Sequence, residues 1–162
     1  MGIKILITGG TFDKEYDEIT GQLQFKDTHI PAMLKTARSR LPIHVRNIMM
    51  VDSLEMSDID RKIILEICKK SEEDKIVITH GTDTMEKTAR QLGEEITGKT
   101  IVLTGAMVPF AFGSSDGFFN LGSALSFVQS LPNGVYIAMN GRYFNWDNVR
   151  KNRELGVFES IK

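Results

Sequence analysis

Two threonine motifs in this sequence combine hydroxyl groups with glycine directly after a short apolar run. Thr8-Gly9-Gly10-Thr11 follows the run 3–7, and Thr79-His80-Gly81-Thr82-Asp83-Thr84 follows Ile76-Val77-Ile78. Glycine lets the backbone turn sharply and lets a ligand approach closely, and a threonine hydroxyl becomes a nucleophile when a base or a cation activates it. The pair therefore indicates hydroxyl-dependent chemistry, although a tight turn and a capped helix would each explain one motif alone.

Three further segments place reactive or polar residues after apolar runs. Val51-Asp52-Ser53-Leu54 offers a hydroxyl and main-chain groups that could hold a carboxylate, and Thr104-Gly105-Ala106 allows close backbone packing beside a pocket. Asp116 is expected either to cap the following helix or to hold the loop before it. Lys151 lies in the basic cluster 150–153, which is typical of a solvated surface. In a threonine-lined pocket the same ammonium would activate a hydroxyl.

Several other kinds of site are excluded. The glycines match neither the dinucleotide fingerprint nor the phosphate loop, because the third glycine and a Gly-Lys-Ser/Thr string are missing. The three histidines lie far apart, so we expect no metal site, and the lone Cys68 excludes an internal disulfide and a multi-cysteine zinc site. Twenty basic and 21 acidic side chains give a net charge of -1, which argues against a nucleic-acid partner.

The composition is that of an ordinary soluble domain. The chain has 162 residues, of which 41% are hydrophobic and 25% charged. No apolar run approaches the roughly 18 residues that a membrane span needs, and the segment Met1–Ile7 lacks the features of a signal peptide. We therefore expect a cytoplasmic protein with no membrane partner.

Apolar runs alternate with helical patterns along the chain. We predict strands over residues 3–7, 43–51, 75–79, 100–103 and 135–139, helices over 57–70, 85–92 and 121–128, and a weaker helix within 29–40. Ser57 is expected to cap the first of these helices with Asp60, and Asp83 and Glu86 are spaced like a second capping box. Residues 12–27 suit a hairpin or a mobile flap, and residues 140–156 lack a regular pattern.

This alternation predicts a single domain of the α/β class. The expected fold is a doubly wound, mostly parallel sheet with helices on both faces, as in three-layer flavodoxin-like or Rossmann-like proteins. Ligands bind at the carboxyl ends of the strands in such sheets. Because both threonine motifs follow predicted strands, we expect them at the same edge of the sheet.

Four strings of the sequence also occur together in one protein family. They are Ile7-Thr8-Gly9-Gly10-Thr11, Thr79-His80-Gly81-Thr82-Asp83-Thr84-Met85-Glu86, Gly105-Ala106-Met107 with Pro109, and Ser115-Asp116-Gly117 with Phe119-Asn120-Leu121. In their order and approximate spacing they resemble the N-terminal domain of the bacterial-type L-asparaginases, and the resemblance covers nearly the whole chain. It implies one such domain over residues 1–162, hydrolysis of L-asparagine and often L-glutamine to the acid and ammonia, and no cofactor.

The resemblance also implies a role for each matching residue. Thr11 matches the nucleophile, Thr82, Asp83 and Lys151 match a proton-handling triad, and Tyr16 is the counterpart of a loop tyrosine. The expected substrate-binding residues are Gly10, Asp52, Ser53, Gly81 and Ala106. Ser53 would hold the α-carboxylate, Asp83 would accept from the α-ammonium, and Ala106 would offer a carbonyl near the amide. The sequence leaves open which threonine attacks and whether water attacks directly.

The chain departs from the family pattern in several places. Leu54 replaces a glutamine, Val108 replaces an arginine, and Phe12-Asp13-Lys14 replaces a continuation of small residues after the nucleophile. The family's smaller C-terminal domain, which lends a carboxylate for the substrate ammonium to a neighbouring subunit, is absent from these 162 residues. Recognition of the ammonium is then expected to rest on Asp83 alone or on another acidic residue.

Two other functions would use the same residues. A regulatory module that binds asparagine or aspartate would need the pocket without catalysis, and an amidotransferase subunit would deamidate within a larger assembly. A third possibility, a protein that carries a flavin, rests on analogy of the fold alone. The family forms homodimers and homotetramers, so the resemblance implies at least a dimer. Tyr143, Phe144 and Trp146 are candidates for an aromatic interface, and packing against the chain's own core is the alternative.

Overall fold

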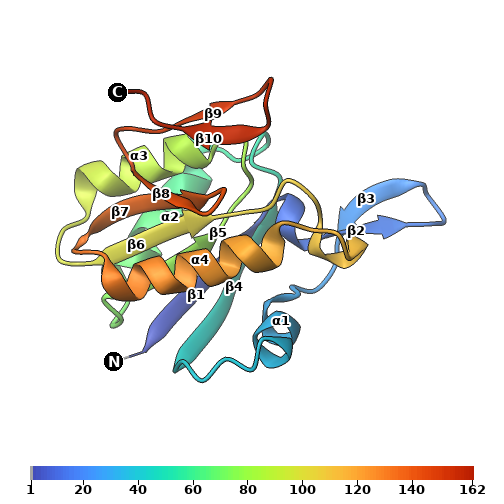
Figure 1. Ribbon diagram of the computed structural model, residues 1–162, viewed down its shortest axis with the longest axis horizontal. Coiled ribbons are helices and arrows are strands. Elements are labelled where there is room, and N and C mark those ends of the chain that lie inside the picture. Colours follow the sequence, from blue (N-terminus) through green and yellow to red (C-terminus); the bar gives the residue numbers. More distant parts are fainter. Residues whose placement is uncertain (1) are drawn as a thin grey trace.

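The centre of the molecule is a six-stranded sheet with the order β4-β1-β5-β6-β7-β8 (Figure 1). The structure is a computed structural model and describes residues 2–162. The strands of this sheet are β1 (Ile3–Gly9), β4 (Ile43–Val51), β5 (Lys75–Thr79), β6 (Thr100–Thr104), β7 (Gly134–Met139) and β8 (Arg142–Asn145). All five predicted strands are confirmed, and β8 is an addition to them.

The strand directions confirm a mostly parallel sheet. Strands β4, β1, β5, β6 and β7 are parallel to their neighbours, and β8 pairs with β7 in the antiparallel direction. The chain leaves β1 to form β4 on one side and returns to the other side of β1 to form β5. The strand order therefore reverses between β1 and β5, and crevices that bind ligands form at such a switch point.

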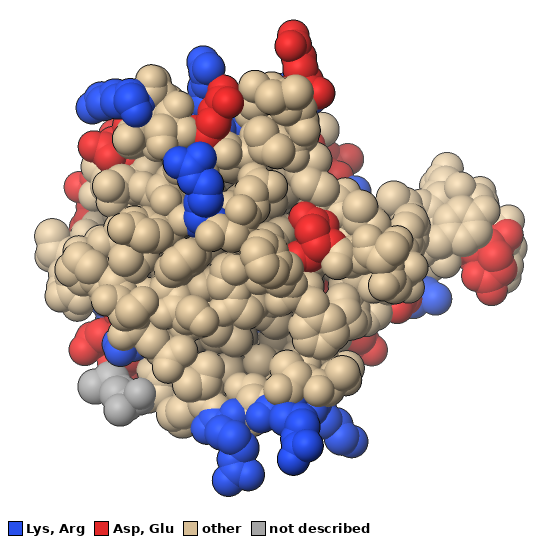
Figure 2. All heavy atoms as spheres, viewed as in Figure 1, with Lys and Arg blue, Asp and Glu red and all other residues tan. Residues whose placement is uncertain are grey.

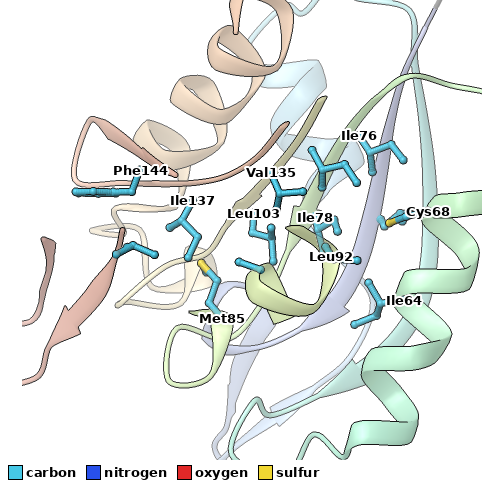
Figure 3. Packing of buried hydrophobic residues seen from close by; sticks show 14 of the residues in the cluster. Ile64, Cys68, Ile76, Ile78, Met85, Leu92, Leu103, Val135, Ile137 and Phe144 are labelled. Atoms are coloured by element: carbon cyan, nitrogen blue, oxygen red, sulfur yellow. The ribbon is translucent and has the colours of Figure 1, made fainter. Parts of the chain in front are cut away.

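Helices cover both faces of the sheet, which confirms the predicted three-layer, doubly wound fold. One face packs against α2 (Asp58–Lys70) and α3 (Met85–Glu95), and the other packs against α1 (Ile30–Thr36) and α4 (Gly117–Ser130). Figure 3 shows the first core, where Ile64 and Leu92 from the helices lie close to Ile78 from the sheet. Strands buried on both faces read as continuous apolar runs, which is why the sequence identified them.

The helix caps follow the prediction at α2 but not at α3. The Ser57 hydroxyl accepts the N–H of Asp60 at 3.2 Å, and the Asp60 carboxylate accepts the N–H of Ser57 at 2.9 Å. The expected capping box of Asp83 and Glu86 is wrong, because α3 is preceded by Thr84 at its N-cap and has no side-chain cap. Both carboxylates instead bind a distant strand, as described below.

Two hairpins extend beyond the sheet. Strands β2 (Lys14–Asp17) and β3 (Gln22–Phe25) form the hairpin that was one of two alternatives for residues 12–27, and it projects from the body (Figure 1). Strands β9 (Arg150–Asn152) and β10 (Val157–Glu159) form the second hairpin. Together with β8 they correct the expectation of irregular structure over 140–156. The 3-10 turns η1 (Thr11–Asp13) and η2 (Phe110–Phe112) complete the chain.

None of the helices within residues 2–162 combines the length and the hydrophobicity required to cross a bilayer.

Candidate active site

The two threonine motifs meet because Gly10 lies directly against Gly81. Gly9 and Gly10 adopt φ values of 106° and 78°, which L side chains rarely tolerate, so the chain can turn sharply after β1. A Cβ atom on Gly10 would lie 2.4 Å from the nitrogen of Gly81. No side chain fits there, and the absence of one lets the loop after β1 contact the loop after β5.

The loop after β4 joins the same cluster through Ser53. A Cβ atom on Gly81 would lie 2.6 Å from the Ser53 hydroxyl oxygen, so Ser53 packs against the glycine backbone. The Ser53 hydroxyl accepts the N–H of Thr84 at 3.3 Å, and its carbonyl accepts the Thr84 hydroxyl at 2.8 Å. The hydroxyl hydrogen of Ser53 therefore stays available for an acceptor such as a substrate carboxylate.

Asp52 is already paired within the protein. Its Oδ2 atom accepts Lys14 Nζ at 2.5 Å, and its Oδ1 atom accepts the N–H of Leu54 at 3.0 Å. The hydrogen bond from Lys14 lowers the pKa of Asp52 below its ordinary value, so this carboxylate is ionised. Both oxygens are thus used to fix the loop that carries Ser53.

Lys151 reaches Thr82 from the β9–β10 hairpin, which lies beside α3 (Figure 1). Its Nζ atom donates to Thr82 Oγ1 at 2.7 Å and to Asp83 Oδ1 at 2.9 Å, and its side chain is only 7% exposed. Its main-chain N–H donates to Glu86 Oε1 at 2.6 Å. This contact and the Asp83 ion pair are the partners that replace the predicted capping box.

Asp83 binds a second cation, Arg153. The guanidinium donates to Asp83 Oδ1 and, at 2.9 Å, to the main-chain carbonyl of the same residue. The hydrogen bonds from Lys151 and then Arg153 lower the pKa of Asp83, in opposition to its partial burial. The Asp83 carboxylate therefore holds both cations as an ion.

The two threonines differ in their partners. Thr82 is buried, and because Lys151 donates to its oxygen, its own hydroxyl hydrogen is left to be donated elsewhere. The hydroxyl of Thr11, within η1, makes no hydrogen bond to any of residues 2–162, and Thr11 is partly exposed. The site thus contains one hydroxyl held by a cation and one unpaired hydroxyl on the neighbouring loop.

The fourth loop, after β6, closes one side of the site. A Cβ atom on Gly105 would lie 2.4 Å from the carbonyl oxygen of His80, and Ala106 is buried beside it. The Asp116 carboxylate accepts the N–H groups of Met107 and Val108 at 3.0 Å and does not cap α4. Of the two roles expected for Asp116, holding this loop is confirmed.

His80 is a buried residue that holds the loop after β5 in place. It is fully buried, and burial lowers its pKa to about 4, so the ring is neutral at pH 7. Its Nδ1 atom lies 2.7 Å from the carbonyl oxygen of Gly81, and its Nε2 atom lies 2.7 Å from the Thr88 hydroxyl. Arg61 contacts the hydroxyls of Thr88 and Thr84, which links this support to the loop of Ser53.

The structure gathers the predicted residues with one exception. Lys151 lies in β9, and the other residues lie on adjoining loops after the strands: Gly10, Thr11, Asp52, Ser53, Gly81, Thr82, Asp83 and Ala106. Tyr16 lies in β2 with 54% of its surface exposed, and it makes no hydrogen bond to Thr11, Thr82 or Lys151 within the described residues. Sequence reasoning missed Lys14, Arg61 and Arg153, because nothing local distinguishes them from surface cations.

Residues 2–162 contain no group of three or more His, Cys, Asp and Glu side chains arranged to hold a metal ion. The contacts described above come instead from hydroxyl, carboxylate, ammonium and guanidinium groups. An ammonium against a threonine oxygen stabilises negative charge on that oxygen, and the adjacent start of α3 adds the positive end of a helix dipole. The arrangement suits attack by a hydroxyl on a carbonyl carbon.

Comparison with known proteins gives consistent matches over the full chain. The family model described as "Asparaginase, N-terminal" matches residues 2–162. L-asparaginase 1 of Escherichia coli (strain K12) is 33% identical over 159 residues, which cover 92% of this chain and 47% of the relative. The chain spans about half the length of the curated relatives it matches.

Solved structures agree with the sequence matches. The thermostable L-asparaginase from Thermococcus kodakarensis aligns with a TM-score of 0.88 and 32% identity, covering 99% of this chain and 51% of that chain. A structure described as a probable cytoplasmic L-asparaginase from Campylobacter jejuni aligns with a TM-score of 0.83 and 34% identity, covering 98% and 52%. The region matched includes both threonine motifs and the strand that carries Lys151. This chain belongs to the asparaginase family, of which it represents the N-terminal domain.

Proposed function

We propose that this chain hydrolyses the side-chain amide of L-asparagine to give L-aspartate and ammonia, with a threonine as nucleophile. The observation that carries the proposal is the contact of Lys151 Nζ with Thr82 Oγ1 at 2.7 Å and Asp83 Oδ1 at 2.9 Å, beside the unpaired hydroxyl of Thr11. A site that only binds an amino acid has no need of an ammonium against a buried threonine oxygen. The single domain over residues 1–162 is proposed to carry these groups.

The proposed first step is attack by the Thr11 oxygen on the amide carbon. Thr82 accepts the proton of Thr11 while its own proton passes to the amide nitrogen, which leaves as ammonia. The Lys151 ammonium stabilises negative charge on the Thr82 oxygen during this relay, and Asp83 holds the ammonium in place. The start of α3 and the main-chain N–H groups near Gly10 stabilise the oxyanion of the tetrahedral intermediate.

The second step reverses the relay with water. A water molecule loses a proton through Thr82 to the Thr11 oxygen as it attacks the ester carbon, and L-aspartate is released. The reaction consumes only water and the amide, so we propose that it needs no cofactor.

The substrate is proposed to sit between the loops after β1, β4, β5 and β6. The Ser53 hydroxyl donates to the α-carboxylate, with Gly10, Gly81 and Asp52 shaping the floor and Ala106 offering its carbonyl to the amide N–H groups. Tyr16 joins the site only when the β2–β3 hairpin moves toward it, since the tyrosine is exposed in this structure.

Ammonia release tests the proposal. Purified protein is incubated with L-asparagine, and separately with L-glutamine, alongside the variants Thr11→Ala and Thr82→Ala. Turnover of L-asparagine by the wild type and a loss of about 10²-fold or more in both folded variants are expected. Saturable binding of L-asparagine or L-aspartate without turnover would contradict the proposed hydrolysis and favour an amino-acid sensor.

We also propose that the chain self-associates through the outer face of α4. This helix of 14 residues contains no charged side chain, and it exposes Phe118 and Phe119, the latter by 62% of its surface. Figure 2 shows that the face over α4 is largely free of charged groups. Gly122 and Ser126 line a hollow next to these phenylalanines, so projecting rings and a recess occur on the same helix. A two-fold dimer brings such a patch against itself.

The predicted aromatic cluster divides between core and surface. Phe144 is buried and Trp146 packs against the core of the first face, whereas Tyr143 is exposed and contacts Phe127 of α4 with ring centroids 5.2 Å apart. Sedimentation of the wild type and Phe119→Lys tests the interface. We expect the wild type to be a homodimer or homotetramer. It should dissociate in Phe119→Lys but not in the control Ile59→Lys on α2. A monomeric wild type would exclude it.

We further propose a cytoplasmic location. Cys68 is completely buried within the core, and burial raises the pKa of its thiol to about 12, as suits a structural residue rather than a disulfide partner. Cell fractionation with a tagged chain checks the location, and recovery in a membrane or secreted fraction would contradict it.

A further inference from the structure

The hydrogen bonds around Ser53 bear on how the site recognises a carboxylate. We propose that Thr84 and the buried Arg61 are positioning residues that aim the Ser53 hydroxyl at the α-carboxylate of the substrate. The site then prefers amides that carry this carboxylate, because contacts run from α2 through the start of α3 to the loop after β4. This inference rests on the proposed function and deepens it by naming residues that set the substrate class.

Thr84 occupies the N-cap position of α3, but its side chain does not cap the helix. A threonine at this position usually accepts an N–H of the first helical turn through its hydroxyl oxygen. Within residues 2–162 no such bond forms, and the Thr84 hydroxyl instead donates to the carbonyl oxygen of Ser53 at 2.8 Å. The main-chain N–H of Thr84 donates to the Ser53 hydroxyl oxygen at 3.3 Å. Thr84 therefore holds Ser53 at two points, one on its main chain and one on its side chain.

These contacts leave the hydrogen of the Ser53 hydroxyl for a ligand. Ser53 is only 1% exposed, and the N–H of Thr84 occupies one lone pair of its hydroxyl oxygen. Among residues 2–162 this hydroxyl contacts no acceptor to which it could donate. A buried donor without an acceptor costs free energy, and a hydrogen bond to an ionised acceptor is stronger than one to a neutral acceptor. The carboxylate of a bound substrate would satisfy this donor.

Arg61 fixes Thr84 from α2. Its Nη2 atom donates to the Thr84 hydroxyl oxygen at 2.9 Å, so the hydrogen of that hydroxyl is directed to the Ser53 carbonyl. Its Nη1 atom donates to the carbonyl oxygen of Met56 at 3.3 Å, at the end of the loop that carries Ser53. The guanidinium thereby ties α2 to the start of α3 and to the loop after β4.

The charge of Arg61 has little compensation within the described part of the chain. Its side chain is 6% exposed, and the carboxylate that it contacts, Asp58 at 3.4 Å, is 96% exposed. The other groups that it contacts are neutral oxygen atoms. Burial of a guanidinium with one solvent-exposed partner costs stability, which an apolar side chain in the same space would avoid. We infer that the arginine serves the site, where its positive charge two hydrogen bonds from Ser53 favours an anionic ligand.

Thr88 provides a matched control for Thr84. Its hydroxyl oxygen accepts Nε of Arg61 at 3.2 Å and lies 2.7 Å from Nε2 of His80. Within residues 2–162 it makes no hydrogen bond to Ser53. Thr84→Val and Thr88→Val each remove one hydroxyl that contacts the same arginine, but only Thr84→Val changes the contacts of Ser53. Thr84→Ser keeps the hydroxyl and controls for the change of side chain.

The experiment compares two substrates that differ only in the carboxylate. The ratio of kcat/KM for L-asparagine to kcat/KM for 3-aminopropanamide, which is the same amide without its carboxylate, is measured in the wild type and the variants. The ratio is expected to fall about tenfold in Thr84→Val and in Arg61→Met, mainly because KM for L-asparagine rises. It is expected to stay near the wild-type value in Thr84→Ser and Thr88→Val. An unchanged ratio in Thr84→Val, or a loss confined to kcat, overturns the inference. Arg61→Met decides in the same way if Thr84→Val does not fold.

A binding measurement separates this inference from the proposed function. Calorimetry with L-aspartate and with β-alanine, which is the same compound without its α-carboxylate, measures the preference without turnover. A Kd for L-aspartate that rises in Thr84→Val while the Kd for β-alanine stays constant supports the inference even if the wild type releases no ammonia, in which case only the proposed hydrolysis fails. Turnover by the wild type with an equal change, or no change, for both ligands overturns the inference and leaves the hydrolysis standing. If the wild type neither binds L-aspartate at millimolar concentration nor hydrolyses L-asparagine, both are overturned.

Discussion

Replacing Lys151 with methionine keeps the length of the side chain and removes the ammonium that contacts Thr82 and Asp83. The side chain is 7% exposed, so water cannot easily substitute for the lost charge. Thr82 loses its partner at 2.7 Å, and the proton relay then has to place negative charge on an oxygen without a neighbouring cation. The substitution should therefore act on the chemical step.

The expected magnitudes differ for catalysis and for stability. Loss of one preorganised donor to a developing anion costs about 10²- to 10³-fold in kcat. The stability of the fold decreases less, because Arg153 still binds Asp83 through the carboxylate oxygen Oδ1 and the main-chain carbonyl. We expect a decrease of about 1 kcal/mol in the free energy of unfolding, which corresponds to ~2–4 °C in Tm for a domain of this size.

The assay is steady-state ammonia release from L-asparagine with thermal unfolding measured on the same samples. Arg150→Met is the control, since it removes a cation from the same strand without touching Thr82 or Asp83. A kcat for Lys151→Met within about threefold of the wild type would refute the reasoning. A collapse of Tm would instead assign Lys151 a mainly structural role.

Three further predictions concern packing and pH. Gly10→Ala should abolish ammonia release and lower the free energy of unfolding by at least ~2 kcal/mol, because its Cβ would lie 2.4 Å from the nitrogen of Gly81. The control Gly21→Ala has a similar φ of 70°, but its Cβ would meet only the Tyr16 hydroxyl, at 3.9 Å, so it should cost about 1 kcal/mol. Burial opposes ionisation of Glu73, yet hydrogen bonds from His44, Ser71 and Lys4 lower its pKa to about 2, so the ion stabilises the fold by about 2 kcal/mol at pH 7. This contribution should be lost as pH falls from about 4.5 to 2, and urea unfolding of Glu73→Gln should lack that loss. Burial lowers the pKa of His80 to about 4. The free energy of unfolding should therefore also fall between pH 6.5 and 4, because only the unfolded chain takes up a proton at this histidine. A His80→Gln variant that kept this fall would contradict the account.

The sheet and the meeting of the loops follow from the sequence for a clear reason. Strands β1, β5 and β6 are buried on both faces, so they appear as apolar runs, broken in β1 only by the partly buried Lys4. Once the sheet is parallel, Thr11 and Thr82 must lie at the same edge, since each follows the carboxyl end of a strand. The glycines at 10 and 81 then indicate how closely the two loops approach.

The hairpin that completes the site could not be predicted in the same way. Strand β9 has three polar residues and no alternation of apolar side chains, so Lys151 was assigned its role only through the family resemblance. Asp83 and Glu86 have the spacing of a local capping box, but the distant strand is the partner that both carboxylates bind. Arg153 belongs to a basic run that is typical of a solvated face, and its contact with Asp83 is seen only in the folded structure, where it follows directly after β9.

The most direct test of the proposed reaction is to trap the acyl-enzyme. Wild-type protein mixed with L-asparagine is quenched in acid during turnover and digested, and the peptides are analysed by mass spectrometry. We predict a β-aspartyl ester on the peptide containing Thr11, and none on the peptide containing Thr82. An ester on Thr82, or turnover without any covalent species in wild type and Lys151→Met alike, would contradict attack by Thr11.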